Sequence, residues 1–314
     1  MTLHHELDRY LTIRRSLGYD LGTAERVLRR FVAFAEASKV SHITVDLFLR
    51  WQQSFGKAGR QTWGARFGMV RLFAQWLHGL DERHEVLPRG LVPHHTRRVR
   101  PYIYSASEVA AIIGQAGQLP SVYGMRGLTC ATLFGLIANT GLRISEALGL
   151  DSSDVDLNAG VLHIRQGKLG KERLLPLAAS AVERLHIYAA ERDRLLGKTP
   201  LPFFVKCDGK RFGDCGARYN FAQVCQQIGL RAPQEYHRHG RGPRIHDLRH
   251  SFAARTMIDW YRTGKDPGRE MIKLTTWLGH SKPDHTYWYI EAVPELLELA
   301  SARIANALDV EARQ

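Results

Sequence analysis

From Leu3 to about Leu91 the chain shows the apolar spacing of amphipathic helices. Apolar residues recur three or four positions apart, which places them on one face of each helix. They are Leu7, Tyr10, Leu11, Val27, Leu28, Phe31, Val32, Phe34, Ala35, Phe67, Val70, Phe73, Ala74 and Leu77. A further stretch, Thr44 to Phe55, opens on a threonine that can cap a helix. We predict a four-helix domain over residues 1–92.

This periodicity is interrupted after the fourth stretch. The segment Leu91 to Pro101 contains two prolines and three arginines without an apolar repeat, which is typical of an extended linker. We place the linker at residues 93–104. A second domain then begins at residue 105, where Ser105 or Ser107 can cap the first helix.

The second domain, predicted over residues 105–290, combines helices with a small sheet. A strongly apolar helix spans Leu128 to Ile137. Between Val155 and Leu177 the pattern changes to strands, with Val161 to Arg165 and Arg173 to Leu177 on either side of a tight turn. Helices follow to the end of the chain. The predicted fold class is therefore mainly α with a small antiparallel β-sheet.

Residues 291–314 form a predicted tail helix that begins near Pro294. Its apolar stripe comprises Val293, Leu296, Leu297, Ala300, Ile304, Ala307 and Leu308. Periodicity does not identify the surface that such a stripe covers. Packing on its own domain and docking on another protomer both stay open.

Composition adds a strong positive charge. Lys and Arg number 44 against 31 Asp and Glu, which gives a net charge of +13 and a pI near 9.8. Such a charge favours a polyanionic partner. Four cysteines without a C-x-x-C pair are too few for a disulfide scaffold and indicate a reducing compartment. Without a signal segment or an apolar run of about 18 residues, we expect a cytoplasmic protein with no membrane partner.

The fourth helical stretch carries Arg60, Arg66 and Arg71 between its apolar positions. One interpretation is a solvated helix face, the usual role of interleaved charge. The other is contact with the phosphates of a nucleic acid. The motifs of the second domain favour the nucleic acid.

Those motifs match what phosphodiester exchange requires, namely fixed cations around a phosphorus that gains negative charge and a proton donor for the leaving oxygen. Arg143 lies in Gly141-Leu-Arg-Ile-Ser-Glu146, where Asn139 to Gly141 should end one helix before the next begins. A guanidinium near a helix N-terminus suits phosphate, and Glu146 could hold it in place. The alternative is a surface ion pair at helical spacing.

Lys168 and Lys171 flank the tight turn of the hairpin. A lysine at this place can reach a groove and give up a proton as an acid. A solvated basic turn is the other interpretation, and it is favoured for Lys171.

The stretch Arg244-Ile-His-Asp-Leu-Arg-His-Ser-Phe252 predicts a helix on which His246, Arg249 and His250 share one face. Two imidazoles and a guanidinium make an anion site. The spacing of the two histidines also matches a zinc pair, but Asp247 stands where a glutamate is expected. A structural, partly buried role is a further interpretation for His250.

Trp277-Leu-Gly-His280 should end a helix at Gly279, and Ser281 can cap the next helix, which carries Tyr287, Trp288 and Tyr289. A phenol is unreactive at its ordinary pKa near 10, so a nucleophilic tyrosine needs positive charge or a base beside it. The arginines would supply the charge. An aromatic packing strip accounts for Tyr287 or Trp288.

Together these motifs resemble the tyrosine recombinase, or phage integrase, family. They are, in the family's order, Gly141 to Glu146, Gly167 to Pro176, His246 to His250 and Leu278 to His280, with Tyr289 nine residues further on. The resemblance covers Ser105 to Tyr289, and the helical front half resembles the family's core-binding domain. Each motif is weak alone, but their order is specific.

The resemblance implies a role for each residue. Arg143 and Arg249 would clamp the phosphate, His246 would bind phosphate and handle protons, and His280 would hydrogen-bond the scissile phosphate. Lys168 would be the acid for the leaving 5′ oxygen. Tyr289 would be the nucleophile, chosen over Tyr287 by its distance from His280. No metal and no nucleotide cofactor are implied.

The activity implied is site-specific recombination of double-stranded DNA through a 3′-phosphotyrosyl link, in service of a mobile element. Four protomers would act on two DNA sites, with accessory or sister recombinases as further partners. A type IB topoisomerase-like enzyme and a DNA-binding module without catalysis remain as alternatives. Arg238-His-Gly-Arg241 also resembles a histidine phosphatase signature, but its Gly- and His-rich loop context opposes that interpretation.

Overall fold

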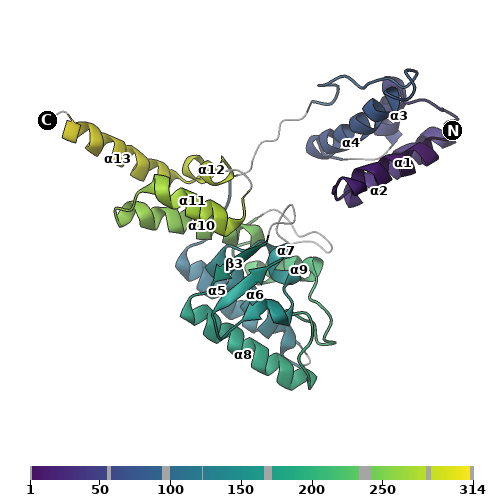
Figure 1. Ribbon diagram of the computed structural model, residues 1–314. Coiled ribbons are helices and arrows are strands. Elements are labelled where there is room, and N and C mark those ends of the chain that lie inside the picture. The colour runs from purple at the N-terminus through teal and green to yellow at the C-terminus, as the bar shows by residue number, and fades with distance from the viewer. Residues whose placement is uncertain are drawn as a thin grey trace. The chain divides into compact units, whose positions relative to one another are not determined.

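The computed structural model describes residues 2–54, 58–93, 100–121, 123–165, 172–232, 242–280 and 284–311. The chain divides into two compact units, Met1–Val99 and Arg100–Gln314, which we call unit 1 and unit 2 (Figure 1). Each is described by itself. The division between them falls inside the segment 93–104, where the sequence predicts a linker.

The described residues of unit 1 form four helices, as the sequence predicts. They are α1 (Leu3–Ser16), α2 (Gly22–Ala37), α3 (Val45–Ser54) and α4 (Arg60–His78). The expected cap of α3 is confirmed, because the Thr44 hydroxyl accepts a hydrogen bond from the Leu47 amide at 3.1 Å. Aromatic rings fill the core, with Trp51 packed edge-on against Phe31 and Trp63 at centroid distances of 5.2 and 5.3 Å.

Unit 2 begins with helices around a buried central helix, followed by the sheet. These elements are α5 (Ala106–Gly117), α6 (Met125–Thr140), α7 (Ile144–Gly149), the 3-10 turn η1 (Ser152–Asp154), β1 (Val155–Asp156), β2 (Val161–Ile164), β3 (Arg173–Pro176), α8 (Ala179–Leu196) and α9 (Asp214–Gln227). Ser105 is the cap of α5, and its amide and hydroxyl exchange hydrogen bonds with Glu108. The fold class expected from the sequence, mainly α with a small antiparallel sheet, is confirmed.

The three strands form one antiparallel sheet in the order β1-β2-β3. Alternation along β2 and β3 turns Leu162, Ile164 and Leu175 into the core. Arg173 pairs with Ile164 at the end of the hairpin next to the turn. The register therefore fixes the position of Arg173 at the start of β3.

The remaining helices of unit 2 gather at one end of it (Figure 1). They are α10 (Ile245–Arg262), α11 (Pro267–Leu278), α12 (Asp284–Ala292) and α13 (Pro294–Glu311). Their core includes Met257, Trp260, Leu274 and Leu296. This group joins the rest of unit 2 through the contact of α10 with α6 and through the C-terminal end of α11, where Trp277 donates to the Thr140 carbonyl at 2.8 Å.

The tail helix α13 begins at Pro294, as predicted, and packs on α10 and α12 of its own chain. Val293 and Leu296 of the apolar stripe are buried there. Glu295 forms an ion pair with Arg262 at 2.6 Å on the surface of the same unit. Leu297 and Ile304 of the stripe remain 53% and 62% exposed, so the chain itself covers only part of the stripe that the structure describes.

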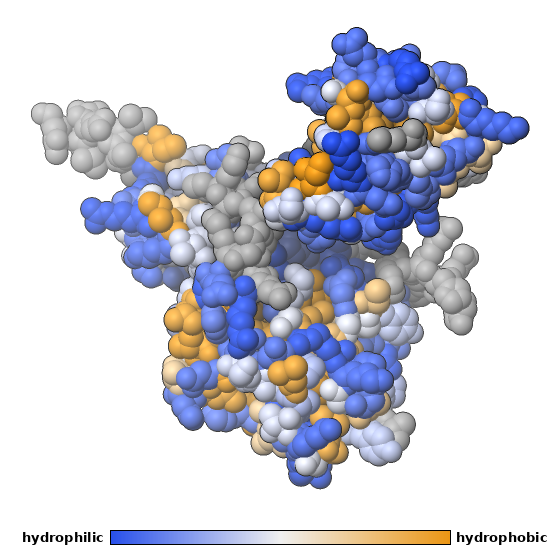
Figure 2. Space-filling model, turned by 45° about the vertical axis from the view of Figure 1, so that its right-hand side comes forward, coloured by the Kyte–Doolittle hydropathy of each residue, from blue (hydrophilic) through white to orange (hydrophobic). Residues whose placement is uncertain are grey.

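The visible surface of both units is largely hydrophilic, with scattered hydrophobic residues (Figure 2). Within the described ranges, none of the helices has both the length and the apolar content that crossing a membrane requires.

Candidate active site

Arg143 lies at the junction of α6 and α7. Gly141 ends α6 in the left-handed conformation with φ +67°, and Arg143 is the N-cap residue of α7, as the sequence predicts. Its guanidinium donates to the Glu146 carboxylate at 2.6 Å and to the Gly279 carbonyl at 3.0 Å. The side chain is 19% exposed, so one part is fixed while another faces solvent.

Glu146 is shared by two arginines. Arg173 of β3 donates to its oxygens at 2.9 and 3.2 Å, and also to the Trp277 carbonyl at 2.9 Å. Burial raises the pKa of Glu146, but the hydrogen bonds and charges of Arg173 and Arg143 outweigh burial and hold it below its usual value. The buried carboxylate is therefore ionised. In the sequence Arg173 stood out only as part of the hairpin motif, because periodicity does not report contacts between distant segments.

Arg249 of α10 is 1% exposed. It donates to the Gly141 carbonyl at 2.6 Å and to the Leu278 carbonyl at 2.7 Å, so it joins the C-terminal ends of α6 and α11. Burial, and then the positive charge of Arg143, lower its pKa to about 10. The group still carries its charge at neutral pH, where the like charge of Arg143 opposes it and the carboxylate of Glu146 favours it.

His246 opens the same helix one turn before Arg249. Burial, followed by the charge of Arg249, lowers its pKa to about 4, so the ring is neutral at neutral pH. Asp247, which stood in the place of a zinc-enzyme glutamate, instead accepts hydrogen bonds from the amide and side chain of Arg244. It therefore has a helix-capping role.

His280 follows the left-handed residue Gly279, which ends α11 with φ +63° as expected. Its Nδ1 lies 2.8 Å from the Thr286 hydroxyl, and Thr286 accepts a hydrogen bond from Thr275 at 3.1 Å. If the Thr286 hydroxyl donates to Nδ1, the ring proton of His280 lies on Nε2, which can then donate outward. Sequence reasoning missed Thr286, since a threonine inside a helix has no distinguishing pattern.

Tyr289 and Tyr287 of α12 differ sharply in environment. Tyr289 is 2% exposed and its hydroxyl lies 2.8 Å from His250 Nδ1, whereas Tyr287 is 48% exposed. The interaction of Tyr289 with Arg249 raises the pKa of that arginine, which places the phenol near the cation cluster. The buried tyrosine is thus the one that the spacing from His280 selected.

Three groups of predicted residues lie outside the described residues. Lys168 and Lys171 lie between β2 and β3 in the sequence, and Arg238 to Arg241 precede α10. Ser281, the predicted cap of α12, is a third case. The structure brings together Arg143, His246, Arg249, His280 and Tyr289 from α7, α10, α12 and the end of α11.

Among the described residues, one group outside this site has the side chains that could hold a metal ion. His42, Asp81 and His84 of unit 1 have candidate ligand atoms within 4.8 Å of one another. However, His84 Nδ1 accepts a hydrogen bond from the Ile43 amide at 3.0 Å, so the neutral ring carries its proton on Nε2. Neither ring nitrogen of His84 keeps a free lone pair for a metal. Both carboxylate oxygens of Asp81 accept hydrogen bonds from Arg83. This arrangement does not favour a metal.

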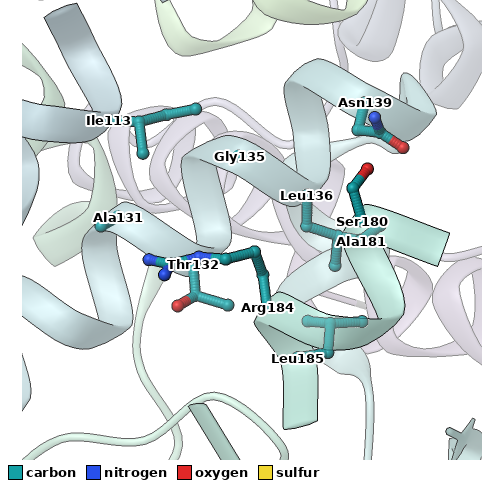
Figure 3. A pocket seen from close by; sticks show the side chains of 10 residues that line it. All are labelled: Ile113, Ala131, Thr132, Gly135, Leu136, Asn139, Ser180, Ala181, Arg184 and Leu185. Carbon is teal, nitrogen blue, oxygen red and sulfur yellow. The ribbon is translucent and has the colours of Figure 1, made fainter. Parts of the chain in front are cut away.

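A pocket of about 220 Å³ lies between α5, α6 and α8 (Figure 3). Ile113, Ala131, Gly135 and Leu185 give it mostly apolar walls, and Arg184 is its charged residue. None of the residues that line it is a predicted catalytic residue.

A helical fold that surrounds one buried tyrosine with arginines and histidines defines a class of enzyme, the site-specific recombinases that use tyrosine. The chain belongs to the phage integrase family, which matches residues 106–295. A relative in Sinorhizobium fredii that carries the name integrase/recombinase y4rB is 37% identical over 308 residues, covering 96% of this chain and 97% of the relative.

Two solved structures show the same fold. The site-specific recombinase XerH bound to its difH substrate has a TM-score of 0.63 at 19% identity, and covers 90% of this chain and 79% of that chain. The Tn1549 transposon integrase bound to transposon end DNA also has a TM-score of 0.63, at 15% identity, and covers 98% and 99%. The family identifies an enzyme of site-specific recombination, and favours neither a topoisomerase nor a module without catalysis.

Proposed function

We propose that unit 2 cuts and rejoins DNA strands through a covalent link between Tyr289 and a 3′ phosphate. The observation that carries the proposal is the position of the Tyr289 hydroxyl. It is buried, hydrogen-bonded to His250 of α10, and close enough to Arg249 to raise the pKa of that arginine. A phenol in this environment can reach a phosphate that the arginines attract.

The arginines would act on the transition state. Arg143 and Arg249 are held by carbonyls and by Glu146, so they lose little freedom when a phosphate arrives. Their fixed charges would stabilise the extra negative charge on five-coordinate phosphorus. His280 Nε2 would donate to a phosphate oxygen, and His246 would bind phosphate and handle protons. Lys168 would protonate the leaving 5′ oxygen.

The link to Tyr289 retains the energy of the broken phosphodiester, so the 5′ hydroxyl of a partner strand can attack it without ATP. The substrate would be two double-stranded DNA sites, bound by four protomers, with accessory or sister recombinases as further partners. The integrase name of the relative and the shared fold with a transposon integrase support service to a mobile element.

Unit 1 would bind the DNA backbone. Arg26 and Arg30 of α2 and Arg66 of α4 line a half-open pocket of about 270 Å³ together with Thr23 and Thr62. Guanidinium and hydroxyl groups of this kind are common phosphate ligands. Arg71, which the sequence offered as another contact, donates to the Leu87 carbonyl at 2.9 Å, so it also has a structural role.

The test uses a nicked duplex from the DNA that flanks the gene, because cleavage of such a suicide substrate traps the covalent adduct. Wild type and Tyr287→Phe should form the adduct, whereas Tyr289→Phe should bind the duplex and form none. An adduct that persists in Tyr289→Phe and is lost in Tyr287→Phe would overturn the assignment.

A further inference from the structure

His250 touches the atom that would attack phosphorus. Its Nδ1 lies 2.8 Å from the Tyr289 hydroxyl, and the two rings have centroids 5.4 Å apart. His250 is half-buried on α10, and Tyr289 is buried on α12, 39 residues later. The contact therefore joins two helices at the proposed nucleophile.

The environment of His250 favours its neutral form. Burial, and then the charges of His246, Arg244 and Arg249, lower its pKa to about 3. A neutral imidazole has one nitrogen that accepts a hydrogen bond and one that donates. With its proton on Nε2, the ring accepts the Tyr289 hydroxyl at Nδ1.

We propose that His250 is a catalytic residue that takes the phenolic proton of Tyr289 during strand cleavage, an inference that rests on the function proposed above. His246, whose ring lies 4.6 Å from that of His250, is left to contact the phosphate. Two histidines one helical turn apart then divide two tasks.

The proton balance of the step is as follows. The O–H bond of Tyr289 breaks and its proton moves to His250 Nδ1, while the freed electron pair forms the bond to phosphorus. The bond from phosphorus to the 5′ oxygen breaks, and that oxygen takes a proton from Lys168. In the joining step the 5′ hydroxyl gives its proton back to Lys168 as it attacks phosphorus, the bond from phosphorus to the Tyr289 oxygen breaks, and the imidazolium returns its proton to the leaving phenolate.

Bound DNA would make this transfer easier. The positive groups around His250 disfavour an added proton, but a phosphate drawn to Arg143 and Arg249 brings negative charge to the same place. His250 therefore becomes a stronger base when the substrate arrives.

The first experiment measures adduct formation by His250→Asn on the nicked duplex. An asparagine oxygen can accept the tyrosine hydrogen bond but cannot take the proton. We expect a loss of about 100-fold or more in the cleavage rate with unchanged duplex binding. His186→Asn, on an exposed position of α8, is the control and should cleave like wild type. Cleavage by His250→Asn at the wild-type rate would overturn the proposal.

Two chemical substitutions distinguish proton transfer at the nucleophile from proton transfer at the leaving group. A substrate with sulfur in place of the bridging 5′ oxygen needs no acid, so it should rescue Lys168→Ala but not His250→Asn. A fluorotyrosine at position 289, which loses its proton more readily, should rescue His250→Asn but not Lys168→Ala. The reverse pattern would reject a role of His250 at the nucleophile.

Folding and the underlying function are checked separately. If His250→Asn does not fold, as judged by its thermal unfolding, His250→Gln is measured in the same way. An inactive Tyr289→Phe beside a fully active His250 variant would remove this inference and leave the proposed function standing. An adduct in Tyr289→Phe would remove both.

Discussion

The carboxylate of Glu146 accepts two hydrogen bonds from Arg173, although the two residues are 27 positions apart in the chain. The pair joins the start of α7 to the start of β3. Because Arg143 is bonded to the same carboxylate, the position of one arginine depends on that of the other.

Loss of the Glu146 charge should therefore weaken both the fold and the site. Glu146→Gln leaves two guanidinium groups facing each other without their buried anion. We expect the free energy of unfolding to fall by about 3 to 5 kcal/mol. Urea unfolding measures it, with Glu183→Gln on an exposed position of α8 as the control. Equal stability of the two variants would contradict the shared role of Glu146.

Gly141 is needed for its backbone and for its lack of a side chain. Its φ is +67°, and an added Cβ would lie 2.5 Å from Phe252 Cδ1. Arg249 also donates to its carbonyl, so a displaced backbone would move that arginine. Gly141→Ala should lower stability by roughly 2 kcal/mol or more and slow strand cleavage.

The matched control is Gly149→Ala at the end of α7. An added Cβ there has no neighbour within 4 Å, and φ is not positive. Thermal unfolding and adduct formation should be close to wild type. A similar loss in both alanine variants would show that the effect is not specific to the conformation of Gly141.

Stability should fall as the solution is acidified from about pH 6.5 towards pH 4. His246 and His250 have folded-state pKa values near 4 and 3, below the ordinary value of 6.5, so the unfolded chain binds more protons in this range. Unfolding is therefore favoured as pH falls, and the full stability is present above about pH 6.5. Because the pKa of Glu146 is also lowered, its contribution to stability is lost only at more acidic pH.

Denaturant unfolding at a series of pH values provides the measurement. A variant carrying His246→Gln and His250→Gln should show a flatter profile between pH 6.5 and 4 than wild type. The exposed substitution His186→Gln should leave the profile unchanged. An equally steep profile in the double variant would mean that other groups cause the loss.

Arg26 of unit 1 should contribute to DNA binding through charge. If it neutralises one phosphate, Arg26→Ala lowers affinity and reduces the slope of log affinity against log salt by about 0.9. Arg83→Ala is the control, because that arginine already holds Asp81 at 2.7 Å. Titration of duplex at several salt concentrations tests both, and an unchanged slope in Arg26→Ala would place DNA elsewhere.

Helices and strands were predictable because their signals are local. The apolar spacing in unit 1, the Ser105 cap and the left-handed glycines at 141 and 279 each act within a few residues, and the structure has all of them. The hairpin strands followed from alternation in the same way.

Contacts between distant segments were less accessible. Thr286 beside His280 and Arg173 beside Glu146 depend on how helices and strands pack, and neither residue type is distinctive in its position. His250 was seen to share a face with Arg249, but its contact with Tyr289 required the placement of α12 against α10. The residues of the site were visible in the sequence, and their pairing was not.

The buried charge of Arg249 has a consequence for the folding equilibrium. Two carbonyls accept its hydrogen bonds, the like charge of Arg143 opposes its charge, and the carboxylate of Glu146 favours it. A phosphate bound beside Arg143 and Arg249 would add negative charge there, and any ligand that prefers the native state shifts the folding equilibrium towards it. A duplex bound at the active site would therefore also raise the free energy of unfolding of the recombinase.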